Sequence, residues 1–197
     1  MNDTKERILL TALRLFARDG YEAVSVSDIA GALGMTKGAL YRHYPSKRAI
    51  FDSILLRMEQ RDVEQARQYD VPETEPDGEQ SASPGDIAAF SRAMFRYWTE
   101  DDFAASFRRL LTLEQFHSAE MGKLYQQYLA AGPMDYLTGL FTALGLPDPR
   151  KRAAAYYGPM FLLYSVYDQA EDRAAILALA DECLKTIVEE RKREEST

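Results

Sequence analysis

Residues Val24–Phe51 read VSVSDIAGALGMTKGALYRHYPSKRAIF, and this stretch decides the fold. Ser25 opens an S-x-x-D capping box, which predicts the start of a helix. Gly34 ends that helix, because glycine readily adopts the left-handed conformation of helix ends. A second helix is predicted from its N-cap, Thr36, to about Tyr44. Two short helices around a glycine turn form a helix-turn-helix.

Longer helices are predicted on both sides of this motif. Residues 4–19 carry an apolar stripe that ends at Gly20, and they should pack on the two short helices to complete a three-helix domain. Pro45 stops the second short helix, and Ser46 caps the next, which runs to about Arg67. That helix begins inside the three-helix domain and leaves it, so it is the physical link to the rest of the chain.

The outward positions of the motif suit the chemistry of DNA. Lys37 can donate to the O6 and N7 atoms of guanine, and Ala39 can contact a thymine methyl group. Gly38 lets the backbone approach the duplex closely, while Thr36 and Lys47 can donate to phosphates. The predicted DNA-binding residues are Ser25, Ser27, Thr36, Lys37, Gly38, Ala39, Tyr41, Arg42, His43 and Lys47.

The pieces ILLTALRLFARDGYEAVSVSDIA and GMTKGALYRHYPSKRAIF, within residues 5–52, resemble the DNA-binding domain of the TetR family of bacterial transcriptional regulators, in its AcrR-like form. Met35 and Tyr44 stand where the family usually has valine and phenylalanine. The resemblance implies an all-α protein without cofactors. It places a three-helix DNA-binding domain at residues 1–50 and a helical domain for effector binding and dimerisation at residues 51–197.

Composition agrees with a protein that touches DNA at one end. The net charge of the 197 residues is −7. Residues 1–50 hold eight basic and five acidic residues, so they carry +3; the remaining sixteen and twenty-six give −10. A single cysteine, Cys183, excludes an internal disulfide and fits the reducing cytoplasm. No apolar run reaches the roughly 20 residues of a membrane span, and no signal peptide is recognised.

Residues 70–86, DVPETEPDGEQSASPGD, hold three prolines, six acids and no base, and are predicted to form a flexible loop. Helices resume after it, with Asp86 as the expected cap of the first and Asp148-Pro149 as a later start signal. The expected spans are 87–100, 102–117, 119–131, 133–145, 150–168 and 172–193.

The second domain is rich in aromatic residues and methionine, which indicates an apolar ligand cavity in view of the family resemblance. Glu114 and His117 continue an apolar stripe of the helix at 102–117. They are either solvated or paired residues at the edge of the core, or polar groups at the end of the cavity. The candidate effector-binding residues are Met94, Trp98, Phe107, Leu110, Glu114, His117, Tyr125, Tyr156, Met160 and Tyr164.

The helix at 150–168 is apolar on two faces, so it should be buried on both sides. One side can face the cavity and the other a second copy of the chain, as the resemblance implies. The expected dimer-interface residues are Tyr157, Phe161, Leu177, Ala180, Leu184, Ile187 and Val188.

Two other function classes make different demands on the sequence. A helix-turn-helix protein with an architectural role and no small-molecule effector would keep the same DNA-binding residues but fill its core completely. An enzyme is disfavoured, because the sequence offers no catalytic residues, no phosphate loop and no metal-ligand cluster.

Overall fold

A computed structural model describes residues 3–68 and 83–195, and every regular element in these ranges is an α-helix. The all-α class predicted from the sequence is therefore confirmed. Most of the acidic stretch expected to form a loop lies outside the described residues. The described chain divides into two compact units, each with its own core, and each is taken in turn below.

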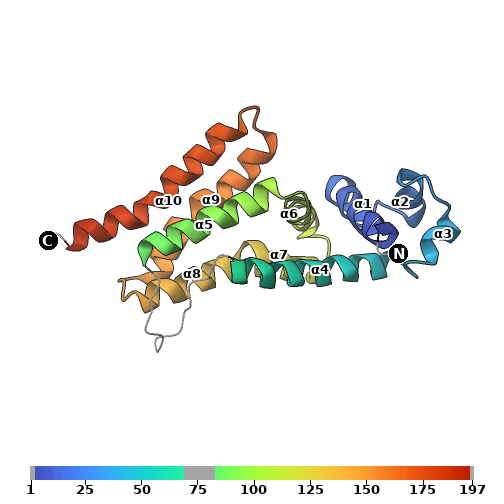
Figure 1. The fold of residues 1–197 in the computed structure, drawn as a ribbon. Coiled ribbons are helices and arrows are strands. Elements are labelled where there is room, and N and C mark those ends of the chain that lie inside the picture. The colour runs from blue at the N-terminus through green and yellow to red at the C-terminus, as the bar shows by residue number, and fades with distance from the viewer. Residues whose placement is uncertain (1–2, 69–82, 196–197) are drawn as a thin grey trace. The chain divides into compact units, whose positions relative to one another are not determined.

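The first unit comprises the chain up to Ala66 together with Asp102–Tyr125. Its helices are α1 (Asp3–Asp19), α2 (Val26–Ala32), α3 (Lys37–Tyr41), most of α4 (Lys47–Gln68), α6 (Asp102–Glu114) and the first part of α7 (Ala119–Leu129). The helix α1 packs against both α2 and α6, and α2 packs against α3 (Figure 1).

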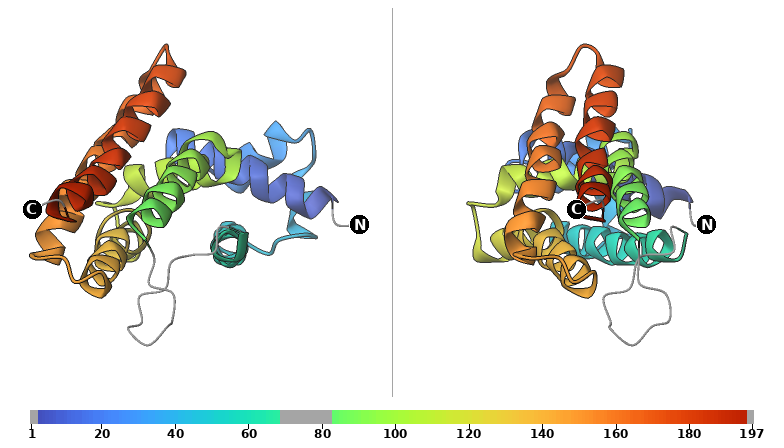
Figure 2. Two further views of the ribbon diagram at one scale, coloured as in Figure 1. Left: turned by 60° about the vertical axis from the view of Figure 1, so that its left-hand side comes forward. Right: turned by 90° about the vertical axis from the view of Figure 1, so that its left-hand side faces the viewer.

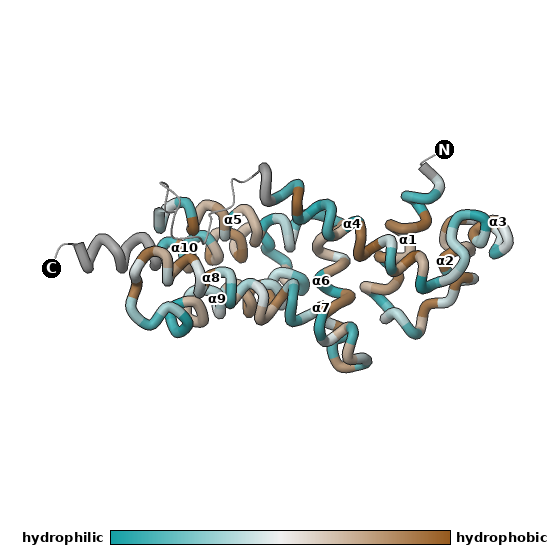
Figure 3. Tube along the Cα trace, turned by 90° about the horizontal axis from the view of Figure 1, so that it is seen from below, coloured by the Kyte–Doolittle hydropathy of each residue, from teal (hydrophilic) through white to brown (hydrophobic). Residues whose placement is uncertain are grey.

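The core of this unit forms because each amphipathic helix turns one apolar stripe inward. Hydrophobic and hydrophilic stretches alternate along α1 (Figure 3), and its Phe16 is fully buried together with Leu40 of α3 and Phe51 and Ile54 of α4. Burying a side chain of this size stabilises the fold by about 1.5–3 kcal/mol. The helices α1, α2 and α3 therefore share their core with α4 and α6.

The second unit comprises Arg67–Asp101 and Gln126–Thr197. Its helices are α5 (Pro84–Glu100), the end of α7, α8 (Ala131–Ala143), α9 (Pro149–Gln169) and α10 (Arg173–Glu195). The helices α9 and α10 run side by side in both views of Figure 2, and α5 packs against each of them. The helix α8 packs against α9.

Several boundaries differ from the sequence-based expectation. The helix α3 ends at Tyr41, short of Tyr44, and α6 ends at Glu114. The helix α5 begins at Pro84, and its N-cap is Ser83, with Asp86 as the reciprocal partner of a capping box. The expected cap at Asp86 was thus wrong by three residues, because the S-x-x-D signal lay within a stretch interpreted as loop.

The junction between α7 and α8 depends on a glycine. The break falls at Ala130, and a Cβ atom built on Gly132 would lie 1.9 Å from the carbonyl oxygen of Gln127. Only glycine allows this close approach of two backbones. The prolyl start of α9 is as expected, but Asp148 adopts a left-handed conformation (φ 50°) and makes no side-chain cap hydrogen bond.

The two units do not coincide with the expected division at residue 50, because most of α4 and all of α6 belong to the first unit. The assignment of separate functions to residues 1–50 and 51–197 stays a prediction. Within the described residues, no helix is both long and apolar enough to span a membrane.

Candidate nucleic-acid interface and ligand cavity

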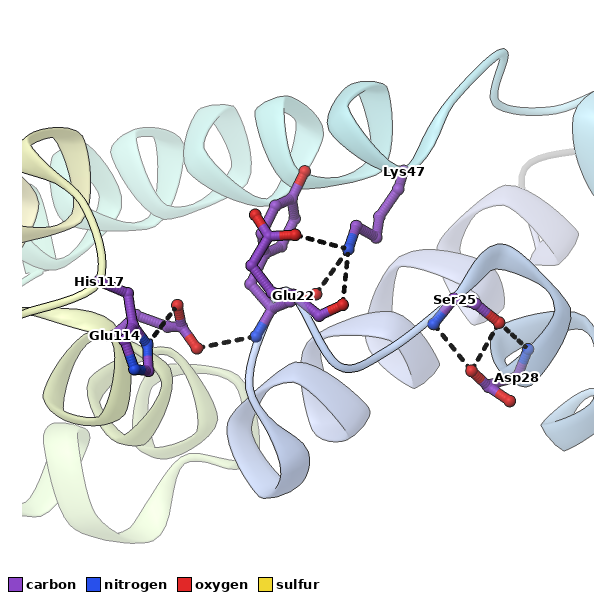
Figure 4. Close-up of polar contacts among 7 residues, drawn as sticks. Glu22, Ser25, Asp28, Lys47, Glu114 and His117 are labelled. Carbon is purple, nitrogen blue, oxygen red and sulfur yellow. Dashed lines mark hydrogen bonds and ion pairs between the residues drawn. The ribbon is translucent and has the colours of Figure 1, made fainter.

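The N-terminus of α2 is built as the sequence predicts. The Ser25 hydroxyl oxygen accepts a hydrogen bond from the Asp28 amide (3.2 Å), and the Asp28 carboxylate accepts one from the Ser25 amide at 2.8 Å (Figure 4). Hydrogen bonds from Ser25 hold the pKa of the Asp28 carboxyl below its usual value. The capping box therefore fixes where α2 begins.

The helix α3 presents its polar and basic side chains to solvent. The Thr36 hydroxyl oxygen accepts a hydrogen bond from the Ala39 amide at 3.1 Å, which leaves its hydrogen available for another acceptor. Lys37 and Tyr41 are exposed and lie together, with the Lys37 ammonium 5.8 Å from the ring centroid. A Cβ atom on Gly38 would meet no protein atom within 4 Å. The fold itself does not require glycine at this position.

None of the ten predicted DNA-binding residues is buried. Ala39, His43 and Lys47 are partly exposed, and the other seven are exposed. The local structure therefore brings together a surface of amide, hydroxyl and cationic donors, which is the chemistry that DNA phosphates and base edges require.

Lys47 makes contacts that the sequence did not indicate. Its ammonium donates to the carbonyl oxygen of Tyr21 at 2.7 Å and lies 4.3 Å from the centroid of the Tyr21 ring (Figure 4). An ion pair with Glu22 at 3.7 Å adds to this. The ammonium thus holds the turn between α1 and α2, and its predicted phosphate contact stays a prediction.

Glu114 holds the same turn from α6. Its carboxylate accepts hydrogen bonds from the Tyr21 amide (3.0 Å) and pairs with Nδ1 of His117 at 3.1 Å (Figure 4). The Glu114 side chain is 3% exposed, whereas that of His117 is 62% exposed. Of the two interpretations drawn from the sequence, the paired one describes Glu114, which has a structural partner at the helix-turn-helix.

We define the Tyr21 junction as Gly20, Tyr21, Lys47 and Glu114. The Tyr21 ring also packs between Phe16 and Phe51, with centroid distances of 5.1 and 5.2 Å. Sequence reasoning missed this junction. The only available signal was the G-Y pair after the first helix.

A second tie joins α4 to the first turn of α7. Arg48 donates two hydrogen bonds of 2.7 Å to the Glu120 carboxylate, and a third to Asp52 at 2.6 Å. These contacts lower the pKa of Glu120 and raise that of Arg48. All three side chains are about half exposed, so the contribution to stability is modest, up to about 1 kcal/mol.

The second unit contains an apolar cavity of about 170 Å³. Its wall is built by α5, α7, α8 and α9, with Trp98 and Tyr128 in edge-to-face contact at 6.3 Å and Phe90 and Tyr136 at 5.8 Å. The lining residues are Phe90, Ser91, Met94, Trp98, Tyr128, Pro133, Tyr136, Leu137, Tyr157, Met160 and Tyr164.

Four of the predicted effector-binding residues line this cavity: Met94, Trp98, Met160 and Tyr164. Tyr156 is buried in the same unit without lining the cavity. The other five belong to the first unit, namely Phe107, Leu110, Glu114, His117 and Tyr125. Helical periodicity identified the buried face that carries Phe107, Leu110 and Glu114 but could not tell on which helices that face packs, and His117 is exposed. Tyr157, expected at the dimer interface, lines the cavity and donates to the carbonyl oxygen of Leu129 at 2.8 Å.

The expected dimer-interface residues are also distributed differently. Phe161 is 41% exposed, whereas Ala180 and Leu184 are buried inside their own unit. Leu177 is partly exposed, and the side chains of Ile187 and Val188 lie outside the described residues. The exposed apolar residues near Phe161 on α9 are Leu162 and Val166, and α10 adds Leu179.

The described residues contain no group of three or more potential metal ligands. The side chain of Cys183 is partly exposed.

Comparison with known proteins bears on both units. The profile of the family described as "Bacterial regulatory proteins, tetR family" matches residues 8–54. The HTH-type transcriptional regulator AcrR of Shigella flexneri is 32% identical over 118 residues, which cover 60% of this chain and 50% of that protein. The chain thus spans about half the length of this curated relative.

Solved structures resemble the fold over nearly all of the chain. A transcriptional regulator of the "TerR/AcrR family" from Aquifex aeolicus VF5 is 17% identical, with a TM-score of 0.69 and coverage of 93% of this chain and 99% of that one. The SmeT–triclosan complex is 18% identical, with a TM-score of 0.65 and coverage of 94% and 90%. The Shigella relative and the Aquifex protein are both described as transcriptional regulators, in agreement with the expectation from the sequence that disfavours an enzyme. The matched profile coincides with the capped helix-turn-helix, so residues 8–54 are similar to the N-terminal region of bacterial regulatory proteins of the tetR family.

Proposed function

We propose that this chain is a cytoplasmic, homodimeric transcriptional repressor that a small hydrophobic or aromatic effector releases from a near-palindromic operator. The main support for a small-molecule effector is the aromatic cavity of the second unit, whose volume is about 170 Å³. A purely architectural DNA-binding protein has no use for such a space, since each unfilled cavity lowers stability. The SmeT–triclosan complex, which has the same fold, supports a small-molecule effector.

DNA recognition is assigned to α3 and its N-terminal turn. Lys37 reads a guanine edge, and Thr36 and Tyr41 donate to phosphates. Removing Lys37 should cost roughly 1–3 kcal/mol of binding and relax the base preference at one position of each half-site. One α3 helix of five residues contacts too few base pairs to select a single site in a genome, so two copies must act together.

The exposed apolar residues Phe161, Leu162 and Val166 of α9, together with Leu179 of α10, support dimerisation. Leu162 is 63% exposed, and its three companions are between 39% and 45% exposed. Monomeric proteins rarely leave such residues grouped in water. The better test of the interface is therefore Leu162, because replacing the fully buried Leu184 would disrupt the protomer itself.

Release of the protein from DNA follows from the thermodynamic linkage between effector binding and DNA binding. An effector lowers operator affinity only by binding the conformation that does not fit DNA more tightly, and DNA must weaken effector binding by the same factor, typically 5–150-fold. The sequence contains one tryptophan, and Trp98 lines the cavity, so its emission reports occupancy.

The experiment uses the full chain and a duplex that the protein selects from random oligonucleotides. Hydrophobic compounds that shift Trp98 emission are expected to lower affinity for the selected duplex by 5–150-fold. Trp98→Phe is the matched control, since it should lose the optical signal and retain release. Compounds that shift the emission but leave DNA affinity unchanged would favour the architectural alternative.

A further inference from the structure

Among the residues that the structure describes, the cavity lining includes no Asp, Glu, Lys, Arg or His. Arg92, next in sequence to the lining residue Ser91, is paired with Asp181 at 2.9 Å. A charged ligand group inside the cavity would lose its hydration without gaining an opposite charge from the lining, which weakens binding. The lining therefore disfavours both carboxylates and ammonium groups.

One polar position interrupts the apolar wall. Ser91 lines the cavity and is 6% exposed. Its neighbour is the hydroxyl of Tyr156, which is fully buried and has no hydrogen-bond partner of good geometry. Burial raises the pKa of Tyr156 to about 12, so this hydroxyl keeps its hydrogen at neutral pH. A buried hydroxyl that lacks a full hydrogen bond destabilises the fold, and a ligand that completes the hydrogen bond is favoured.

The size of the cavity limits the ligand further. A dry protein cavity of about 150 Å³ is known to accept benzene, so about 170 Å³ suits one aromatic ring with small substituents. The edge-to-face pairs on the wall, Trp98–Tyr128 and Phe90–Tyr136, offer ring faces and edges to such a ligand.

We propose that the cavity selects uncharged, single-ring aromatic molecules that carry a hydroxyl group, namely small phenols, and that Ser91 and Tyr156 recognise this hydroxyl. The proposal rests on the proposed function, since it names the chemistry of the effector. Ser91 contacts the ligand hydroxyl, and Tyr156 completes a chain of hydrogen bonds through Ser91.

The test titrates the full chain with four ligands of nearly equal size and follows Trp98 emission. The ligands are 4-ethylphenol, ethylbenzene, 4-ethylbenzoate and 4-ethylbenzylammonium. The phenol is expected to bind about tenfold more tightly than ethylbenzene, the value of one net hydrogen bond. The two ions are expected to bind at least a hundredfold more weakly than the phenol, because no described lining residue carries a charge.

Two variants test the hydroxyl site. In Ser91→Ala the preference for 4-ethylphenol over ethylbenzene should disappear while ethylbenzene binding stays the same, and Tyr156→Phe should reduce the same preference. Ser106→Ala is the matched control, since Ser106 is an equally buried serine of α6 that does not line the cavity.

Equal or tighter binding of 4-ethylbenzoate would overturn the proposal, as would failure of all four ligands to bind or a preference that survives in both variants. The effect on DNA is read separately with the selected duplex. If the ligands bind in the expected order without lowering DNA affinity, the ligand class stands and the proposed regulation fails.

Discussion

Replacing Gly20 by alanine tests the Tyr21 junction most directly. Gly20 has a φ of +92°, and a Cβ atom there would lie 2.8 Å from Oε1 of Glu114. The left-handed conformation costs an alanine roughly 1–2 kcal/mol. To relieve the overlap, the carboxylate must move away from the Tyr21 amide, which forfeits a hydrogen bond to a charged group worth about 1.5–3 kcal/mol. Gly20→Ala should therefore lower the free energy of unfolding by about 3–5 kcal/mol.

The same structure predicts that Gly20→Ala and Glu114→Ala are not additive. Glu114→Ala removes the carboxylate, so in the double variant the new Cβ has nothing to displace. The additional cost of Gly20→Ala in that background is then the backbone strain alone. The double variant should therefore lose about 1.5–3 kcal/mol less than the sum of the two single variants. Glu114→Gln is the matched control, because its amide oxygen can still accept from the Tyr21 amide.

Urea denaturation at one fixed protein concentration measures the wild-type protein and the four variants, since unfolding of an oligomer depends on concentration. If the two substitutions add to within about 0.5 kcal/mol, the contact between Gly20 and Glu114 does not exist in solution and the description of the junction is wrong.

Four shorter predictions follow. Gly38→Ala should raise stability by up to about 1 kcal/mol, because its Cβ meets nothing in the protein, but it should weaken binding to the selected duplex. Gly31→Ala in α2, whose Cβ also meets nothing, should raise stability without weakening DNA binding. Equal DNA binding by both variants would contradict the proposed interface. Lys47→Met should cost about 1–3 kcal/mol of stability through the lost hydrogen bond to the Tyr21 carbonyl oxygen. It should also reduce the slope of DNA affinity against salt concentration by about one. An unchanged slope would mean that Lys47 acts only in the Tyr21 junction and does not contact a phosphate. Burial raises the pKa of Asp62 to about 6 from 3.8. Between these values the folded state binds more protons than the unfolded state, so stability falls as pH rises through them. In thermal melts Asp62→Asn should therefore be more stable than the wild-type protein above pH 6, and this gain should vanish below about pH 4. Leu162→Glu should give monomers of unchanged helicity in sedimentation experiments, and a stable dimer would place the interface elsewhere.

The starts of α2 and α3 were predictable from sequence because they depend on neighbouring residues. The caps at Ser25 and Thr36 lie where local spacing puts them, and each uses an amide three residues ahead. The end of α3 was not predictable from spacing alone. Leu40 and Tyr44 are both buried, as one helical face would require, but Tyr44 lies in the segment that follows the helix. Pro45 disfavours helical backbone in the residue before it, and this local rule overrides the apparent periodicity.

The cavity could be predicted only in part, for a different reason. Periodicity reveals which face of a helix is buried but not its neighbours. Phe107 and Leu110 carry the same signal as Met94 and Met160, yet α6 completes the core of the first unit. The lining residues Ser91 and Tyr128 carry no pattern at all, because a cavity arises from the packing of four helices and not from any one of them.

The Tyr21 junction explains why α4 and α6 both bear on the recognition motif. The amide of Tyr21 is held by Glu114 of α6, and its carbonyl oxygen by Lys47 of α4. A single residue thus has its two backbone groups satisfied by different helices. If α6 shifts relative to α4 by more than the few tenths of an ångström that a hydrogen bond tolerates, one of these bonds must lengthen or the turn must follow. Because the turn leads directly into the capping box of α2, the position of α2 and α3 depends on the two helices together.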